Sequence, residues 1–398
     1  MSTLSSARPS SESRRRHLRT LSAALATPSL AMASARLGPT VDPAVDIHDL
    51  PAPPAQTEGP PVLARNGRPF NHAPHLSGWG SGTIPFDRED RSFRFGFIGD
   101  TPYNRLDQYG LTRVMAGLDE TDLAFVLHVG DIKGRAEPCS DTLLLDRLER
   151  LDRSRHPLIL TPGDNEWTDC RNYRTDDPFA PGKPLERLHW LRSQIYHYPE
   201  SLGSRRIQVE QQRQMITQLS TQESNQIEQP RLPENMRWRI GSLQFCTIHV
   251  VGSNNGMAND PTQRQAWAIR QQANATWLTE TAVLAKRYGA KGLVIATHAN
   301  MQFERDRNDG WTATRQAIIS TAADFDGPVA LLHGDTHIFR TDRLLLKSHG
   351  LERFIRVECF GSPFSWQWVT IRWNPEAATL AKADPEIGPA FQVYTHHG

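Results

Sequence analysis

Acidic and imidazole side chains follow short apolar runs at five points along the sequence. The residues at these points are Asp100, Asp131, Asp164, His298 and the pair Asp335 and His337. In a parallel α/β sheet the carboxyl ends of the strands face one crevice, where ligands bind. Four carboxylates in one crevice repel each other unless cations lie between them. Carboxylate oxygens bind hard divalent cations and imidazole adds affinity for Zn, Mn or Fe, so the pattern predicts a metal centre.

A carboxylate shared by two ions would make this centre dinuclear, and Asp131, in the middle of the series, is the simplest bridge. Two metals about 3.5–4 Å apart form the usual clamp for phosphoryl chemistry. Each residue also has a plainer explanation. Gly-Asp after a strand is often a turn or a helix N-cap, and His298 alone could be a hydrogen-bonded core histidine. The recurrence of the pattern in the same context favours the metal centre.

The segments around these residues alternate between strand and helix patterns. Strands are predicted at 93–98, 123–129 and 157–160, and helices at 111–119 and 143–153. Intervals of 31 residues from Asp100 to Asp131 and 33 residues from Asp131 to Asp164 fit one βαβ unit of roughly thirty residues. Further strands are predicted at 237–251, 292–296 and 329–332, a long helix at 264–288, and antiparallel strands over 354–373. The predicted fold class is α/β.

The remaining segments differ in composition. Residues 1–35 hold five arginines against one acid and end in Ala31-Met32-Ala33-Ser34-Ala35, which is typical of a secretory signal peptide. Arg14-Arg15 resembles a twin-arginine (Tat) signal, so we expect a periplasmic or secreted protein; a disordered basic tail and an organelle transit peptide are alternatives. We expect a Pro/Gly-rich extended arm at 36–90, the main domain at 91–375 with a polar helical insertion at 181–235, and a C-terminal tail at 376–398.

The composition argues against several classes of protein. The 398 residues include 45 basic and 44 acidic side chains, a net charge of +1, so a broad basic surface for nucleic acid is not expected. No apolar stretch approaches the roughly eighteen residues of a membrane span. Four cysteines, none spaced C-x-x-C, are too few for a disulfide scaffold or a zinc ribbon. The sequence indicates nothing about the oligomeric state.

The order of the motifs resembles that of the calcineurin-like metallophosphoesterases, over roughly residues 93–340. That family has the blocks Asp-x-His, Gly-Asp, Gly-Asn-His-Asp/Glu, a lone His and Gly-His-x-His. The matching segments here are Gly99-Asp100-Thr101-Pro102-Tyr103, His128-Val129-Gly130-Asp131, Gly163-Asp164-Asn165-Glu166, Thr297-His298 and His333-Gly334-Asp335-Thr336-His337. The resemblance implies a four-layer α/β/β/α sandwich of two mixed sheets, with a metal site at the C-terminal ends of the strands.

The resemblance also implies a ligand set, with departures from the family pattern. One metal would be held by Asp100, Asp131 and His337, and the other by Asp131, Asp164, His298 and Asp335. Pro102 stands where the first block has its His, so Tyr103 or a water would fill that place. Asp164 replaces an Asn and Asp335 a His, which favours hard cations such as Mn²⁺, Mg²⁺ or Ca²⁺, with Fe and Zn as further choices. Sliding the third block by one residue would make Asn165 the ligand, but would take Gly163 and Glu166 out of register.

The activity implied by the resemblance is hydrolysis of a phosphate ester by a metal-bridging hydroxide, on a small phosphorylated substrate. Asn165 replaces the catalytic His of the third block and is expected to donate a hydrogen bond to a phosphate oxygen. His333 is the candidate acid for the leaving group, unless it is packed in the core. Tyr103, Asn254 and Asn255 are expected to contact substrate, unless 253–256 is merely a turn.

The altered ligand set also suits a competing interpretation, a non-catalytic exported binding protein that is stabilised by one structural ion. Metal content separates the two, because two ions per chain favour the enzyme. A nuclease is disfavoured, since no basic run is present outside the N-terminal signal region.

The four cysteines fall into two pairs by context. Cys139 and Cys170 follow the second and third motifs in loops on one rim of the sheet, whereas Cys246 and Cys359 lie in strand patterns. In an oxidising compartment the two loop thiols could pair, closing a 31-residue loop and stabilising the fold by about 3–4 kcal/mol. We predict this disulfide, although four cysteines allow three full pairings.

Overall fold

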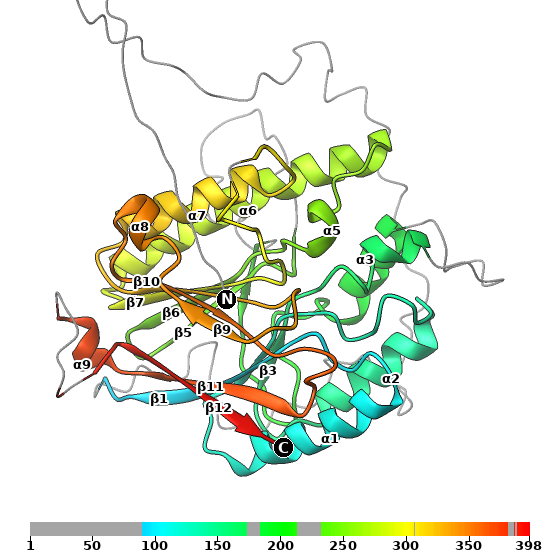
Figure 1. Cartoon of the computed structure of the whole chain (residues 1–398), viewed down its shortest axis with the longest axis horizontal. Helices are drawn as coiled ribbons and strands as arrows, with labels where there is room; N and C mark the ends of the chain where they lie inside the picture. Colours follow the sequence, from blue (N-terminus) through cyan, green and yellow to red (C-terminus); the bar gives the residue numbers. More distant parts are fainter. Residues whose placement is uncertain (1–89, 173–183, 213–231, 306, 381–385, 387) are drawn as a thin grey trace, which may run out of the picture. The chain divides into compact units, whose positions relative to one another are not determined.

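The computed structural model describes residues 90–172, 184–212, 232–305, 307–380, 386 and 388–398 (Figure 1). The predicted signal at 1–35 lies outside the described residues, as does the predicted arm at 36–90 apart from Asp90. Among the described residues, no helix combines the length and the apolar character that crossing a membrane requires.

A five-stranded mixed sheet carries the first three acidic motifs. Its strands are β1 (Phe93–Ile98), β2 (Val126–His128), β3 (Leu158–Leu160), β11 (Gln367–Trp373) and β12 (Phe391–His397), in the order β12-β11-β1-β2-β3. Strands β1, β2 and β3 are parallel and are connected by α1 (Arg105–Glu120) and α2 (Asp141–Asp152). The predicted β–α–β–α–β alternation is confirmed.

The crossover helices begin at side-chain caps. The side chain of Asn104 accepts from the backbone N–H groups of Leu106 and Asp107 at the start of α1, and Ser140 caps α2 in the same way. Such caps satisfy backbone donors that have no partner within the helix. Because Asn104 follows Tyr103 directly, the start of α1 also fixes the approach of Tyr103 to the strand ends.

The C-terminal segment differs from the tail that we expected at 376–398. Residues Phe391–His397 form β12, which pairs antiparallel with β11 from Gln367 opposite His397 to Trp373 opposite Phe391. The rings of Trp373 and Phe391 lie 5.1 Å apart, and Phe391 is buried. This strand closes one edge of the five-stranded sheet, so the expected tail is wrong for these seven residues.

A seven-stranded mixed sheet carries the histidine motifs. Its strands are β4 (Glu210–Gln211), β5 (Met236–Ile240), β6 (Leu243–Thr247), β7 (Gly292–Ala296), β8 (Val329–His333), β10 (Phe354–Glu358) and β9 (Arg340–Asp342), in that order. Strands β6, β7, β8 and β10 are parallel neighbours. The antiparallel strands expected over 354–373 therefore separate: β10 joins this sheet beside β8, while β11 joins the other sheet, antiparallel to β1.

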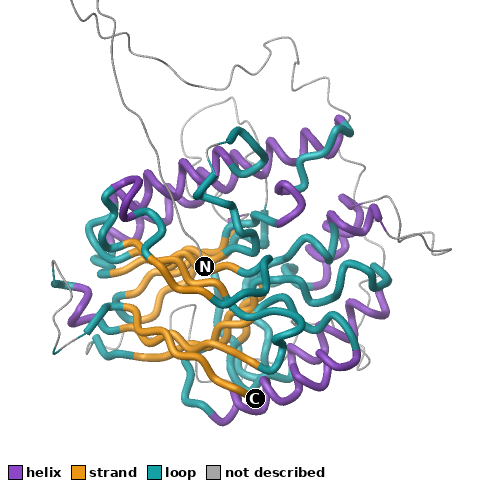
Figure 2. The backbone as a smooth tube through the Cα atoms, viewed as in Figure 1, coloured by secondary structure: helices purple, strands orange, loops and turns teal. Residues whose placement is uncertain are grey.

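Helices cover the outer face of each sheet. In Figures 1 and 2, α1 and α2 lie against the five-stranded sheet, and the long helices α6 (Pro261–Arg287) and α7 (Thr312–Asp324) lie against the seven-stranded sheet. Aromatic rings fill the space between the sheets. Phe95 of β1 stacks on Phe125 at 5.1 Å, and Phe245 of β6 meets both rings edge-on. The next residue, Cys246, belongs to the cluster under α6 and α7, as strand alternation requires. The predicted four-layer α/β/β/α sandwich is confirmed.

The segment that we expected to be a helical insertion, 181–235, is only partly helical where the structure describes it. It contains α3 (Pro184–Gln194) and the short edge strand β4, which pairs antiparallel with β5. Leu202 forms an isolated bridge with Leu158 of β3. The described residues also form the short helices α5 (Gly252–Asn255), α8 (Leu346–His349) and α9 (Pro375–Ala378), and a 3-10 turn at Thr168–Asn172.

Candidate metal centre

The two sheets bring all six predicted ligands to one place. Asp100, Asp131 and Asp164 follow β1, β2 and β3, while His298 follows β7 and the pair Asp335 and His337 follows β8. Ligand atoms lie within 4.8 Å of one another in two groups that share His298. The groups are Asp100, Asp131 and His298, and Asp164, His298 and Asp335. A metal centre is thus sterically possible where the sequence predicts it.

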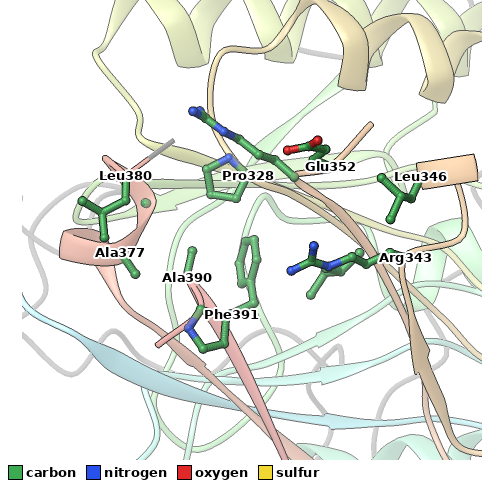
Figure 3. Close-up of a pocket in the computed structure, with 12 residues that line it drawn as sticks. Pro328, Arg343, Leu346, Glu352, Ala377, Leu380, Ala390 and Phe391 are labelled. Carbon is green, nitrogen blue, oxygen red and sulfur yellow. The ribbon is translucent and has the colours of Figure 1, made fainter. Parts of the chain in front are cut away.

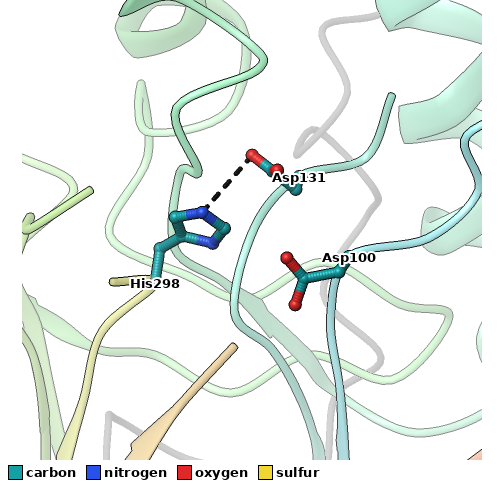
Figure 4. Close-up of side chains that lie close together, drawn as sticks. All are labelled: Asp100, Asp131 and His298. Carbon is teal, nitrogen blue, oxygen red and sulfur yellow. Dashed lines mark ion pairs between the residues drawn. The ribbon is translucent and has the colours of Figure 1, made fainter. Parts of the chain in front are cut away.

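His298 stands at the middle of the acidic residues. Its Nε2 atom lies 3.1 Å from Asp164 Oδ1. The same atom lies 3.5 Å from Asp131 Oδ1 (Figure 4). Its Nδ1 atom lies 2.9 Å from the carbonyl oxygen of Val129, which can only accept, so Nδ1 carries a hydrogen. The other nitrogen is therefore directed at the carboxylates. This is the orientation in which histidines bind metals, with the second ring nitrogen fixed by a backbone acceptor.

Tyr103 and His337 lie beside Asp100 and Asp131 of the first group. Tyr103 Oη lies 2.6 Å from Asp131 Oδ2, 3.2 Å from His337 Nε2 and 3.5 Å from Asp100 Oδ1. His337 Nε2 lies 3.7 Å from Asp100 Oδ1, and its Nδ1 donates to the carbonyl of Ser362 at 2.6 Å. Both histidines of the centre thus present Nε2 and anchor Nδ1 to backbone.

The second group is built around Asp164 and Asp335. A Cβ on Gly252 would lie 2.7 Å from an oxygen of each of these carboxylates, so only glycine allows the chain to pass so close. The next residue, Ser253, has its hydroxyl 2.8 Å from Asp164 Oδ2 and 2.7 Å from Asp169 Oδ1. The Asn300 N–H donates to Asp335 Oδ2 at 3.0 Å. These contacts hold both carboxylates toward His298.

Asn165 donates two hydrogen bonds to Asp131, the carboxylate that we expected to bridge the metals. Its Nδ2 donates to Asp131 Oδ2 at 2.6 Å, and its backbone N–H donates to Asp131 Oδ1 at 2.9 Å. Asp164, rather than Asn165, lies beside His298. This geometry agrees with the ungapped alignment of the third motif.

Burial makes the negative charge of this centre costly. It raises the pKa of Asp100 to about 8, the pKa of Asp335 to about 6, and the pKa of Asp131 well above its usual value, although His298 acts in the opposite direction at each. Carboxylates in such surroundings favour a neutral form unless positive charge is supplied. Divalent cations would supply that charge, so the residues present fit a metal centre.

At Asp164 and His298, neighbouring groups outweigh burial and favour the charged form of the side chain. Burial opposes the charge of Asp164, but hydrogen bonds from His298 and Ser253 lower its pKa to about 2. Burial likewise opposes a proton on His298, but the charge of Asp131 and the hydrogen bond to Asp164 raise its pKa well above the usual value. The acids around His298 thus favour positive charge at this position, and a bound cation would supply that charge with the imidazole in its neutral form.

The backbone around the centre is strained. Asp100, Asp131, Asp335 and His337 have φ angles of 52°, 59°, 80° and 66°. Residues other than glycine rarely adopt this left-handed region, and such strain gathers at functional sites. The concentration at four of the six predicted ligands supports a role that is not merely structural.

Two sequence-predicted contacts have structural roles. His333 is fully buried, with Nδ1 2.9 Å from the carbonyl of Gly334, and burial lowers its pKa to about 3. Asn255 is also fully buried, and its Nδ2 donates to Gln271 and to the Gly310 carbonyl. The geometry therefore does not support a leaving-group acid at His333 or substrate contact by Asn255. Asn254 accepts from the Gly310 N–H through Oδ1 at 2.9 Å, which helps to hold the same turn.

The sequence analysis did not identify Asp169 and Arg135, which form a chain of polar contacts from Ser253 beside the second group. The buried carboxylate of Asp169 receives the Ser253 hydroxyl through Oδ1 and lies 3.1 Å from Arg135 Nε through Oδ2. The Arg135 side chain is 65% exposed, so it offers a cation to an anionic ligand. A signal was present, because Arg135 follows Asp131 by four residues in the same loop.

The predicted disulfide is present. Cys139 and Cys170 are bonded, with Cα atoms 5.8 Å apart, and Cys246 and Cys359 are free and buried. The bond joins the loop after β2 to the 3-10 turn at Thr168–Asn172, and therefore links the loops that follow Asp131 and Asp164.

A cavity of about 450 Å³ lies elsewhere (Figure 3). Its walls include Pro328 and Arg353, which precede β8 and β10, and Phe391 at the start of β12. The first two positions are at the amino ends of parallel strands, whereas the acidic and histidine residues follow the carboxyl ends. The cavity is thus separate from the candidate metal centre.

The sequence matches no family model and no curated protein. Solved structures that match part of this chain include purple acid phosphatase PPD1 from yellow lupin (Lupinus luteus) seeds, at 10% identity and a TM-score of 0.36, over 77% of this chain and 53% of that one. GAP50, the anchor in the inner membrane complex of Plasmodium, is 11% identical with a TM-score of 0.37, over 77% and 88%. TT1561 of Thermus thermophilus is 10% identical with a TM-score of 0.38, over 77% and 99%.

The chain thus spans about half the length of the lupin phosphatase. At these identities and TM-scores the similarities carry no argument about the fold or the activity of this chain.

Proposed function

We propose that this chain is a metal-dependent hydrolase of phosphate esters with a dinuclear divalent-metal site. The observation that carries the proposal is the convergence of four carboxylates around His298: Asp131, Asp164 and Asp335 lie 3.1 to 3.9 Å from its Nε2, and Asp100 shares a group of ligand atoms with it. Asp100, Asp131 and His337 would hold one ion, and Asp131, Asp164, His298 and Asp335 the other. Carboxylate-rich sites of this kind suit hard cations such as Mn²⁺ or Mg²⁺.

Bound metals would activate water and neutralise charge that develops on the phosphoryl group. The chain itself supplies positioning. Asn165 and Tyr103 donate to the same oxygen of Asp131, each at 2.6 Å, and so fix the carboxylate between the two groups. Burial and the Asp131 charge raise the pKa of Tyr103 well above its usual value, which keeps its hydroxyl a donor. The exposed guanidinium of Arg135 is placed to bind a phosphate oxygen.

A turnover screen tests the proposal. The purified protein is stripped with chelator, loaded with Mn²⁺, and assayed against phosphomonoesters, phosphodiesters and nucleotides. We expect hydrolysis that is lost on chelation and restored by Mn²⁺. Absence of turnover on all three classes at full metal loading would overturn the proposal.

A non-catalytic metal-stabilised binding protein is the second candidate. It is favoured by one observation: His298 and His337 are proposed ligands, and His333 is buried with its Nδ1 on the Gly334 carbonyl, so none of these three imidazoles is assigned as the acid for the leaving group. One tightly held ion per chain, without turnover, would establish this alternative.

We further propose that the protein is exported. A disulfide between Cys139 and Cys170 supports an oxidising compartment, and the twin-arginine-like segment would direct it there. Replacing Arg14 and Arg15 by Lys is expected to leave precursor in the cytoplasm. Normal export of that double variant would contradict the twin-arginine route.

A further inference from the structure

Large apolar side chains are exposed in the chain segments that adjoin the candidate metal centre. Of the described residues, Leu106, Tyr109, Ile338 and Phe364 are 64%, 56%, 60% and 47% exposed. Leu106 and Tyr109 closely follow Tyr103 in the sequence, and Ile338 follows His337. Phe364 follows Ser362, whose carbonyl accepts a hydrogen bond from His337. Single exposed apolar residues are ordinary, but a cluster of them indicates a binding surface.

The loop that carries Phe364 is fixed to the metal centre by hydrogen bonds. The Ser362 carbonyl accepts from His337 Nδ1 at 2.6 Å, and the Ser362 N–H donates to the Asp100 carbonyl at 2.9 Å. A Cβ on Gly361 would lie 2.5 Å from the Asp100 Cβ. Because two residues span at most about 7 Å of chain, Phe364 lies close to the first metal group.

The same loop is also fixed to α1. The buried Ser365 hydroxyl donates to Asp107 Oδ1 at 2.6 Å, and on either side of it Phe364 is exposed and Trp366 is half-buried. The Trp366 ring lies 5.3 Å from the ring of Tyr109. Leu106 and Tyr109 are neighbours on α1 because their spacing is i, i+3. We call Leu106, Tyr109, Phe364 and Trp366 the apolar rim.

The two sides of the centre differ in polarity. Beside the second metal group lie Ser253, Asp169 and the exposed guanidinium of Arg135. Beside the first lies the apolar rim. A ligand that spans both sides would carry an anionic group and an apolar body, and aromatic rings would pack best against Tyr109, Phe364 and Trp366.

We propose that the apolar rim binds the leaving group of the substrate, so that this enzyme prefers phosphate esters of aromatic or other apolar alcohols. The inference rests on the proposed hydrolase function and deepens it by naming the substrate class. Hydrogen bonds connect the loop of the apolar rim to His337 and Asp100 of the metal centre. Because the rim adjoins that centre, we favour the leaving group of the substrate, and not a separate macromolecule, as its occupant.

The test compares benzyl phosphate with ethyl phosphate, because both release a primary alkoxide and differ mainly in apolar area. For the Mn²⁺-loaded wild type we expect kcat/KM to be at least about tenfold higher for benzyl phosphate, through a lower KM. Phe364→Ser is expected to reduce this preference several-fold, mainly in KM. The control Val283→Ser, at an exposed apolar position on α6, is expected to keep it. Equal kcat/KM for both esters in the wild type would overturn the inference.

A binding measurement separates this inference from the proposed function. Calorimetry of the Mn²⁺-loaded protein with benzylphosphonate and ethylphosphonate, which cannot be hydrolysed, is expected to show tighter binding of benzylphosphonate and loss of the difference in Phe364→Ser. That result without any turnover would refute the hydrolase while supporting the rim as a ligand site. Turnover without a benzyl preference would refute the rim alone. Sedimentation with phosphatidylcholine vesicles that depends on Phe364, with no benzyl preference, would also overturn it.

Discussion

The phenol oxygen of Tyr103 donates a hydrogen bond of 2.6 Å to Oδ2 of Asp131, although 28 residues separate them in sequence. Tyr103 precedes α1 closely and Asp131 follows β2, so the bond connects two neighbouring strand–helix loops. The Oδ2 atom of Asp131 thus accepts from the side chains of Tyr103 and Asn165, while its Oδ1 atom faces His298. The proposed bridging ligand is thus positioned before any cation arrives.

Replacing Tyr103 by Phe removes this donor and keeps the ring. Hydrogen bonds to charged groups are worth about 1.5–3 kcal/mol, so we expect kcat/KM for phosphate esters to fall roughly tenfold or more, with the fold unchanged. Steady-state kinetics and thermal melting measure the two effects. The matched control is Tyr394→Phe, whose hydroxyl donates to Gln392 on β12 and whose loss should not alter turnover. Equal kinetics for Tyr103→Phe and the wild type would contradict the role of Tyr103.

Asp131→Asn removes one negative charge and keeps the size of the side chain. Because this carboxylate is proposed to serve both ions, we expect turnover to be abolished while the melting temperature changes by only a few degrees. Asp122→Asn, at an exposed acidic position near the start of β2, serves as the control and should behave as the wild type. Near-normal turnover of Asp131→Asn with two bound metals would show that the ligand assignment is wrong.

His249 makes stability depend on pH. It is fully buried beside Trp167, its Nδ1 lies 2.8 Å from Glu234 Oε1, and its Nε2 has no hydrogen-bond partner among the described residues. Burial lowers its pKa from 6.5 to about 4, against the raising effect of Glu234, while the nearby Arg270 and Arg192 also lower it. Between these values the unfolded chain binds a proton that the folded chain does not, so stability falls as pH decreases.

The size of this effect can be measured by urea unfolding at pH 7 and pH 5. We expect His249→Gln to lose about 2 kcal/mol less stability than the wild type over this interval, since one pKa unit corresponds to about 1.4 kcal/mol. Other titrating groups are common to both proteins and cancel in the difference. An identical loss in the two proteins would contradict a neutral buried His249.

The disulfide predicts a stability that depends on redox state. Its loop of 31 residues gives a stabilisation of about 3–4 kcal/mol in the chain-entropy model. We expect reductant to lower the free energy of unfolding of the wild type by this amount and to leave the double variant Cys139→Ser/Cys170→Ser unchanged. Peptide mapping without reduction should recover Cys139 joined to Cys170. Free thiols at both positions in exported protein would refute the prediction.

The placement of the candidate metal centre was predictable because it depends on local patterns. Short apolar runs ending at Asp100, Asp131 and Asp164 fix parallel strands, and parallel strands bring their carboxyl ends together. The pairing of Cys139 with Cys170 follows from the same rule, since both lie in loops at those ends. Even β12 carried a signal, the alternation of Phe391, Val393 and Thr395 with other side chains, although the segment was expected to be a tail.

Other features depend on contacts between distant parts of the chain. Ser253 reaches Asp164 across 89 residues and Asp169 across 84, and no local periodicity encodes those contacts. The residues Ser253–Asn255 adopt left-handed φ angles of 49°, 55° and 56°, a conformation that buried partners such as Gln271 and Gly310 enforce rather than the sequence of the turn. The burial of His333 likewise results from packing between β8 and its neighbours.

The dinuclear centre can be checked by counting the metal ions that each chain binds. Calorimetric titration of chelator-stripped protein with Mn²⁺, checked by elemental analysis after dialysis, is expected to give two ions per chain for the wild type. A value of one ion or none in folded protein would contradict the dinuclear centre formed by Asp100, Asp131, Asp164, His298, Asp335 and His337.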